Sequence, residues 1–187
     1  DLPARLAERG VDLVATGRGG DVTLHAPGQL VVYPIVDLSP DRRDVRKYVS
    51  GLASVMQTLV APWGVRAGLV DGLVGLWVDA AQPSRWEGAE HAARMEKIGA
   101  IGVKISRWVT MHGFALNLTT DLSLFQMIVP CGIREHGVTS LQRLTGQAPT
   151  VAELAEPAAQ HVARTLGGQL ESFTDVSREP AEFLDSL

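Results

Sequence analysis

The chain has 187 residues, of which 45% are hydrophobic and 20% charged, and its net charge is −4. This composition predicts one globular domain, and the negative charge gives no support for general nucleic-acid binding. No apolar run approaches the roughly 20 residues that span a bilayer, and we find no secretory leader pattern. The single cysteine excludes an intrachain disulfide, and a free thiol is typical of the reducing cytoplasm.

Short apolar and β-branched runs predict strands at residues 11–15, 22–25 and 30–37, separated by a glycine-rich turn at 16–21 and a second turn at 26–29. Later strands are expected at residues 74–78, 97–105 and 108–118. The last two are joined by a turn at Ser106 and Arg107.

Helical spacing of apolar residues predicts a helix that begins at Ser39 or Asp41 and runs to about Val60. Short helices are expected at residues 121–128 and 139–144. Thr150, with Glu153 three residues later, has the pattern of a capping box for a helix to about Leu166. Strands mixed with helices, without strict alternation, indicate an α/β (α+β) fold with a mixed β-sheet flanked by helices.

Cys131 stands between Pro130 and Gly132 on a predicted irregular loop. A lone cysteine is most often a small buried filler, but loops held by a scaffold also carry nucleophiles. Its thiol, with an ordinary pKa of about 8.5, needs a nearby cation to ionise near neutral pH. The candidates for that cation are Lys97, Lys104, His25 and His112.

Lys97 and Lys104 lie an odd number of residues apart in one predicted strand, so a regular strand directs them to opposite faces. Lys97 falls on the more apolar face, with Ile101, Val103 and Ile105. Burial there would lower the pKa of Lys97, whereas Lys104 is expected to point to water. A bulge at Gly99 or Gly102 would reverse this relation, and most lysines are simply solvated.

The remaining polar residues carry weaker signals. No histidine–carboxylate spacing indicates a metal site, and a structural role is the commoner one for each histidine. A local basic cluster, Arg42, Arg43, Arg46 and Lys47, is usually a solvated helix face, but it could also meet an acidic protein partner.

Five blocks of sequence, in order, resemble the lipoyl(octanoyl) transferases, the lipoate-protein ligase B family. The blocks are RGGDVTLHAPGQL at 18–30, KIGAIGV at 97–103, HGFALN at 112–117 followed by Asp121-Leu122, PCGI at 130–133 and VTSL at 138–141. The resemblance implies the catalytic-domain fold of biotin and lipoate protein ligases.

The resemblance also implies an activity: transfer of an octanoyl group from octanoyl-acyl carrier protein, through a cysteine thioester, to the lysine of a lipoyl domain. The acceptors would be 2-oxoacid dehydrogenase complexes and the glycine cleavage H protein, and no cofactor or metal is required. Cys131 would be the nucleophile, and Lys97 would lower its pKa and act as general base. The acyl-pocket positions would be Arg18, Gly19, Gly20, Asp21, Val22, Thr23, Leu24, His25, Ala100, Ile101, Gly102, Gly113, Phe114 and Ala115, with His112 as an additional candidate.

Two positions depart from the family pattern: Leu24 replaces an aromatic residue and Ala26 a glycine. The family carries a further N-terminal stretch, and we expect residues 1–187 to form a single acyltransferase domain without it. Three alternatives are an ATP-dependent lipoate or biotin ligase of the same fold, a non-catalytic module that binds acylated proteins, and a catalytically impaired fragment that lacks the N-terminal stretch. Cys131 argues against the first alternative, and the pair of Cys131 and Lys97 argues against the second.

Overall fold

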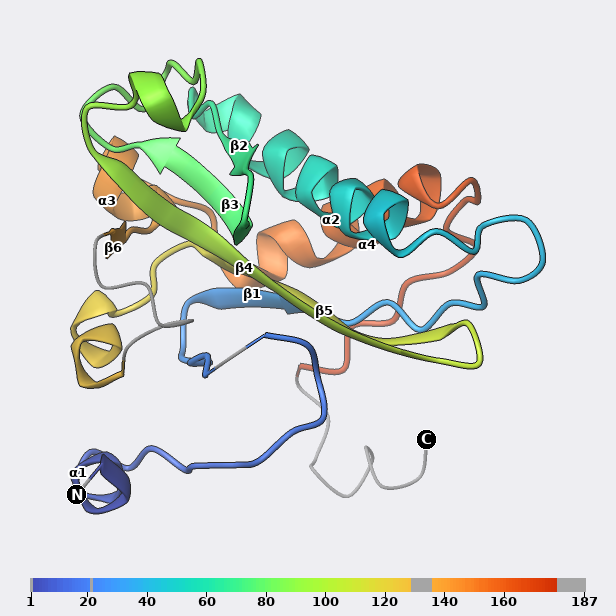
Figure 1. The fold of residues 1–187 in the computed structure, drawn as a ribbon, viewed down its shortest axis with the longest axis horizontal. Coiled ribbons are helices and arrows are strands. Elements are labelled where there is room, and N and C mark those ends of the chain that lie inside the picture. The colour runs from blue at the N-terminus through green and yellow to red at the C-terminus, as the bar shows by residue number, and fades with distance from the viewer. Residues whose placement is uncertain (1, 21, 129–135, 178–187) are drawn as a thin grey trace.

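The computed structural model describes residues 2–20, 22–128 and 136–177. Its centre is a sheet with the strand order β1-β5-β4-β3-β2, and β6 pairs with β4 (Figure 1). The strands are β1 (Gln29–Val32), β2 (Gly68–Val70), β3 (Leu73–Asp79), β4 (Met95–Ser106), β5 (Val109–Asn117) and β6 (Gly137–Val138). The pairing of β6 with β4 is parallel and the other pairings are antiparallel. The predicted mixed sheet with flanking helices is therefore confirmed.

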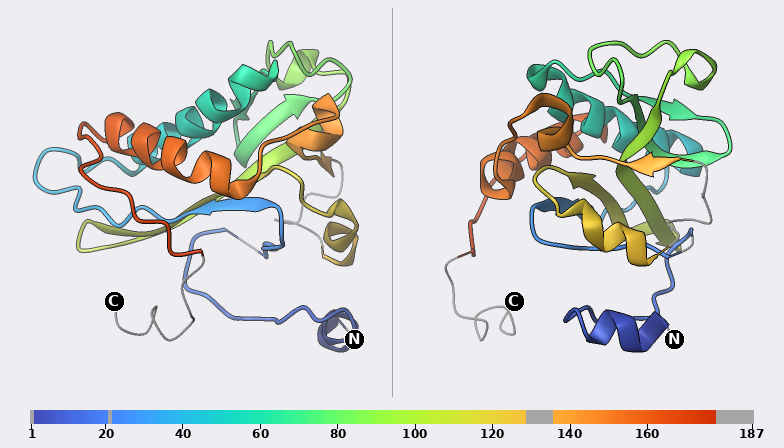
Figure 2. Two further views of the ribbon diagram at one scale, coloured as in Figure 1. Left: turned by 180° about the vertical axis from the view of Figure 1, so that it is seen from behind. Right: turned by 90° about the vertical axis from the view of Figure 1, so that its left-hand side faces the viewer.

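Two helices, α2 (Val45–Val60) and α4 (Val151–Thr165), cover one face of the sheet (Figures 1 and 2). The core lies between these helices and the sheet. Its α2 members recur at helical spacing: Tyr48, Leu52, Val55, Met56 and Leu59. Thr150 and Glu153 form the predicted capping box of α4. No helix in the described ranges combines the length and the apolarity needed to cross a membrane.

The smaller elements lie at the margins of this core. They are α1 (Leu2–Ala7), α3 (Leu141–Thr145), and the 3-10 helices η1 (Ala61–Trp63), η2 (Ala89–His91) and η3 (Leu122–Met127). α1 contacts η3, on the side of the sheet away from α2 and α4 (Figures 1 and 2). The sequence had not indicated α1, β2 or β6, which are too short to show a period.

Two predicted strands near the N-terminus are wrong. Residues 11–15 and 22–25 are irregular, and Leu13 and Val14 are exposed rather than packed against a sheet. The predicted strand at 30–37 is shorter than expected because β1 ends at Val32. Pro34 follows, and a proline has no N–H to donate to a ladder.

Two boundaries also differ from the prediction. α2 begins at Val45 rather than near Ser39 or Asp41, because the side chain of Asp44 accepts a hydrogen bond from the Lys47 N–H and caps the helix. The turn between β4 and β5 is at Arg107 and Trp108, one residue later than predicted. Both have positive φ, 49° and 67°, as the tight turns favoured in hairpins require.

The β3–β4 connection is organised by one buried carboxylate, that of Asp79, which is 5% exposed. It accepts hydrogen bonds from the backbone N–H groups of Ala81, Ala93 and Arg94 at 2.9, 3.0 and 3.1 Å. Burial acts to raise the pKa of Asp79, but these backbone donors outweigh it and hold the pKa below its usual range.

We expect Asp79→Asn to lower the free energy of unfolding by about 1–3 kcal/mol, because an amide NH₂ replaces one acceptor oxygen and faces a backbone donor. The exposed Asp71, in the β2–β3 turn, provides the control: Asp71→Asn should be nearly neutral. Chemical denaturation at pH 7 measures both. Since the folded pKa of Asp79 is depressed, its contribution is present at pH 7 and is lost as pH falls below the ordinary carboxyl range. The difference between wild type and Asp79→Asn should therefore shrink in acid, and a constant difference would contradict this account.

Candidate active site

Lys97 is held at a β-bulge in β4. Trp77 pairs with Lys97 and Leu76 pairs with Gly99, so Ile98 is the extra residue on β4. Ile98 belongs to the core, and a Cβ at Gly99 would lie 2.6 Å from the Met56 sulfur on α2. Both bulge residues therefore face the helices.

Because of the bulge, the prediction that Lys97 shares a face of β4 with Ile101, Val103 and Ile105 is wrong. After the bulge, Ile101 lies in the core and Val103 and Ile105 pack against it, as expected, but Lys97 does not share their face. Lys97 lies on the other side of the sheet with Ala100, where both line one small cavity. Lys97 is nonetheless buried, with 6% exposure, whereas Lys104 is exposed beside Gly17.

The side chain of Lys97 lies against two residues of β3, Trp77 and Gly75. Its Nζ lies 5.4 Å from the centroid of the Trp77 ring, and a Cβ added at Gly75 would overlap Lys97 Cε. His136 makes an edge contact with the same ring, with ring centroids 5.6 Å apart.

A small cavity of about 20 Å³ adjoins Lys97 on the face away from the helices. Its lining comes from the segment of residues 18–25, which we call the glycine-rich segment, and from β1, β4, β5, β6 and η3. The lining residues are Val22, Thr23, Gln29, Lys97, Gly99, Ala100, Ala115, Asn117, Phe125 and Val138. Four of the predicted acyl-pocket residues are therefore brought together here: Val22, Thr23, Ala100 and Ala115.

The glycine-rich segment lies against β4 by close backbone approach. The Gly19 N–H donates to the Val103 carbonyl at 2.9 Å. A Cβ at Gly102 would lie 2.9 Å from Arg18 Cδ and 3.0 Å from the Gly19 carbonyl oxygen. The absence of a side chain at Gly102 is what lets the segment lie so close. Gly20 follows with φ of 91°, a conformation that favours glycine.

The other predicted pocket residues lie elsewhere. Ile101 and Phe114, a cross-strand pair, point into the core between the sheet and the helices. Gly113 is buried against the Val32 carbonyl, and Leu24 is buried beside Gln29, whose side chain donates to its carbonyl. Asp21 lies outside the described residues.

His25 and His112 meet around Tyr33 on a more exposed part of this face. His25 Nδ1 lies 2.7 Å from Gln29 Oε1 and its Nε2 3.3 Å from the Tyr33 hydroxyl. The Tyr33 ring packs edge-on against His112, with centroids 5.4 Å apart. Gln29 joins this group to the cavity beside Lys97.

A buried amide network, which sequence reasoning missed, ties the cavity walls together. Gln29 Nε2 donates to Asn117 Oδ1 at 2.8 Å, and Asn117 Nδ2 donates to the Thr139 carbonyl at 3.0 Å. The Thr139 N–H in turn donates to the Lys97 carbonyl at 2.9 Å. The partners are far apart in sequence, and only the pairing of β1, β5 and β4 brings them together.

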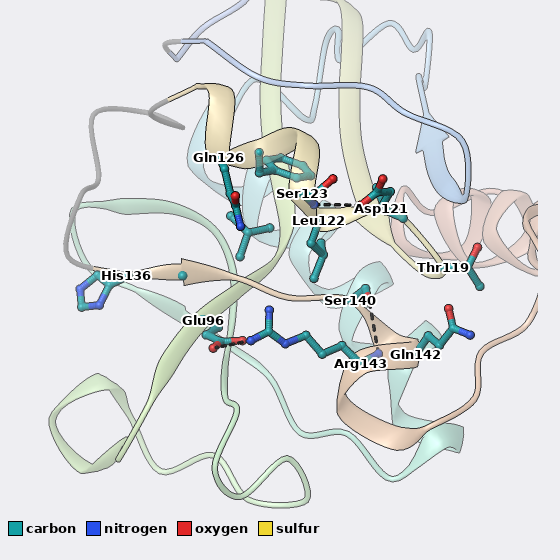
Figure 3. A pocket seen from close by; sticks show the side chains of 14 residues that line it. Glu96, Thr119, Asp121, Leu122, Ser123, Gln126, His136, Ser140, Gln142 and Arg143 are labelled. Atoms are coloured by element: carbon teal, nitrogen blue, oxygen red, sulfur yellow. Dashed lines mark hydrogen bonds and ion pairs between the residues drawn. The ribbon is translucent and has the colours of Figure 1, made fainter. Parts of the chain in front are cut away.

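A larger open cavity of about 750 Å³ lies between η3 and the β6–α3 segment (Figure 3). Arg143 extends from α3 toward the buried Glu96 carboxylate, at 3.9 Å (Figure 3). Arg94 lies 3.2 Å from the same oxygen. On the opposite wall, the backbone N–H and hydroxyl of Ser123 hold the pKa of Asp121 below its usual range.

Cys131 lies in residues 129–135, outside the described residues, together with Pro130 and Gly132. Phe125, in η3 before this segment, and Val138, in β6 after it, both line the cavity beside Lys97. Within the described ranges, no three His, Cys, Asp or Glu side chains are grouped as metal ligands.

Comparison with known proteins identifies relatives of this chain. An octanoyltransferase of Myxococcus xanthus is 51% identical over 83% of this chain and 41% of its own length. An octanoyltransferase of Chloroflexus aggregans is 50% identical over 82% of this chain and 64% of its own length. The chain thus spans about two fifths to two thirds of the length of these relatives.

The fold is shared more widely. The bi-partite lipoate protein ligase of Thermoplasma acidophilum superposes with a TM-score of 0.64 over 95% of this chain and 66% of that chain, at 14% identity. The family model of the lipoyl protein ligase A/B catalytic domain matches residues 2–163. The chain therefore belongs to the lipoyl protein ligase A/B catalytic domain family.

Proposed function

We propose that this chain is an octanoyltransferase catalytic domain that moves an octanoyl group from octanoyl-acyl carrier protein to the lysine of a lipoyl domain. The observation that carries the proposal is the identity of about half of all aligned residues to proteins named octanoyltransferase. The acceptors would be lipoyl domains of 2-oxoacid dehydrogenase complexes and the glycine cleavage H protein. Residues 1–187 would form one domain, acting in the cytoplasm without a cofactor.

In the first half-reaction, Lys97 accepts the proton of the Cys131 thiol, and the thiolate attacks the carbonyl carbon of the donor thioester. The bond from that carbon to the carrier sulfur breaks, and the leaving thiolate takes a proton from Lys97. The acyl group is then held as a thioester on Cys131, which is the logic of covalent catalysis.

In the second half-reaction, the lysine amine of the acceptor attacks this thioester. An amide forms, the Cys131 thiolate leaves, and Lys97 accepts the proton that the amine loses. A lysine amine has an ordinary pKa of about 10.4, so few acceptor amines are neutral at pH 7. A base within reach of the amine makes the attack productive. The donor arrives as a thioester, so no nucleotide is consumed.

The site supports these roles in two ways. Lys97 is buried beside a cavity, which is unusual for a lysine and typical of lysines used in proton transfer. The segment that carries Cys131 is flanked by η3 and β6, which both line that cavity. An octanoyl chain needs more room than about 20 Å³, so we expect the lining to open when the acyl group binds.

The ATP-dependent ligase alternative has less support. The lipoate protein ligase of Thermoplasma acidophilum shares 14% identity with this chain, a likeness that shows the fold alone. Release of pyrophosphate in the presence of ATP and a free acid would favour the ligase. Transfer from the acyl carrier protein without ATP would favour the octanoyltransferase.

We predict that Cys131 becomes octanoylated when the protein is mixed with octanoyl-acyl carrier protein. Intact-mass spectrometry should show one added octanoyl group that hydroxylamine removes. Cys131→Ala should remain folded and unmodified. An adduct that persists in Cys131→Ala would assign the nucleophile to another residue.

We predict that Lys97→Ala lowers the rate of transfer to the acceptor lysine by about 100-fold or more, as expected for loss of a general base. Lys97→Arg keeps the charge and should preserve more thiolate on Cys131, seen as faster alkylation at neutral pH, yet lose most of the second half-reaction. The exposed Lys104 is the matched control, and Lys104→Ala should retain both half-reactions. Rapid-quench measurement of each half-reaction distinguishes these cases, and the opposite ranking of the two lysines would refute the assignment.

We predict that the start of α2 contributes to association with the acidic carrier protein. Arg42 donates to the Leu166 carbonyl and Arg43 lies 5.7 Å from the Trp108 ring, so these two have structural contacts. The double variant Arg46→Glu with Lys47→Glu spares both contacts. It should slow association several-fold at low salt and flatten its salt dependence.

The control for this prediction reverses two exposed charges elsewhere, Arg66→Glu with Arg85→Glu, at the same net charge. Stopped-flow association between low and high salt measures both proteins. Equal association rates for the two double variants would show that the start of α2 is an ordinary solvated surface.

A further inference from the structure

Trp77 and Lys97 face each other directly across β3 and β4. Residues directly opposite in an antiparallel pair project from the same face, so their side chains interact. Lys97 Nζ lies 5.4 Å from the Trp77 ring centroid, within the range of a cation–π interaction. The ring is itself fixed, since Trp77 is 1% exposed and its Nε1–H donates to the Leu73 carbonyl at 3.0 Å.

Gly75 contacts the Lys97 side chain on a second side, next to the Trp77 ring. It stands two residues before Trp77 on β3, with φ of 140°, a conformation that side chains disfavour. A Cβ here would overlap Lys97 Cε and would lie 2.7 Å from the Gly99 carbonyl oxygen. The aliphatic part of Lys97 therefore occupies the space that any other residue at position 75 would fill.

His136 closes the arrangement from the β6 side. Its ring meets the Trp77 ring edge-on, at an interplanar angle of 77°. Edge-to-face packing of this kind is a favoured arrangement of aromatic rings. Trp77 thus contacts both Lys97 and His136.

We propose that Trp77 and Gly75 are positioning residues that form a slot for the Lys97 side chain and direct its amine during acyl transfer. The inference rests on the proposed function. A buried ammonium is costly unless it finds attraction, and the π face of Trp77 supplies part of that attraction. The glycine wall restricts the rotamers of a side chain that is otherwise flexible.

Trp77→Leu tests the ring, and it should reduce the single-turnover rate of acyl transfer by about tenfold or more, with little change in the KM for the acceptor. Trp77→Phe keeps a π face and should recover a large part of the loss. The matched control is Trp108→Leu. Trp108 stands in the β4–β5 turn, and the cation that it contacts is Arg43 rather than Lys97. Equal losses in the Leu and Phe variants of Trp77, or an equal loss in Trp108→Leu, would overturn the proposal.

Gly75→Ala tests the slot, and Gly72→Ala is its control. Both glycines have positive φ, but a Cβ at Gly72 would meet no atom within 4 Å. Both variants therefore carry backbone strain, and only Gly75→Ala also displaces Lys97 and crowds the Gly99 carbonyl. Only Gly75→Ala should slow transfer by more than its loss of stability explains, and parallel effects would refute the slot.

A double-mutant cycle separates positioning from general support of the fold. If Trp77 acts through Lys97, Trp77→Leu should cause no further loss in a Lys97→Ala background. Losses that multiply would show that Trp77 acts on the fold alone.

A readout without acyl transfer keeps this inference distinct from the proposed function. In protein with ¹³C-labelled lysine, the Lys97 ε-methylene protons should be shifted upfield by the Trp77 ring current, and the shift should vanish in Trp77→Leu. A shifted signal in a protein that transfers no octanoyl group would refute the proposed function but leave the slot intact. An unshifted signal in an active enzyme would refute the slot.

Discussion

The bulge at Ile98 is the constraint on which this site depends. A regular β4 would turn Lys97 toward the helices, among the apolar side chains of α2. With Ile98 as one extra residue in β4, Ile98 and Gly99 both face the core, and the Lys97 side chain lies on the opposite face of the sheet. The strand can then pack a core along most of its length and still present one cation to a cavity.

The strand that pairs with the other edge of β4 changes beside the bulge. β5 pairs with β4 from Gly99 onward, and β6 takes its place beside Glu96 and Lys97. The Thr139 N–H bonds the Lys97 carbonyl, and Asn117 at the end of β5 bonds the Thr139 carbonyl. The chain that returns from residues 129–135 is thereby anchored next to Lys97, and Glu96 receives Arg94 and Arg143 on its other side.

Much of this fold could be predicted from the sequence, where local signals and tertiary packing agree. The capping box at Thr150 and Glu153 and the apolar period of α2 are examples. The failures occur where the sequence offers more candidates for a strand or a cap than the structure uses. Leu13 and Val14 have strand propensity but pair with no strand in the described part of the chain. Asp44, rather than Ser39 or Asp41, caps α2 because its carboxylate accepts a hydrogen bond from the Lys47 N–H.

The candidate site divides in the same way. Lys97 is buried, and Val22, Thr23, Ala100 and Ala115 border one small cavity. The acyl-binding role that the sequence blocks imply for these four residues stays a prediction. The face of Lys97 could not be predicted, because a bulge leaves no mark in a run such as Lys97-Ile98-Gly99. Trp77 and Gly75 could not be found either, since their relation to Lys97 exists only once β3 and β4 are in register.

The short outer strands of the sheet have a consequence for the protein in concentrated solution. β1 has four residues and β2 three. A neighbouring molecule that approached either rim would gain few backbone hydrogen bonds, although Val31, Tyr33 and Ile35 are exposed there. The exposed apolar side chains at this rim therefore lie beside strands too short to serve as a template for further strands.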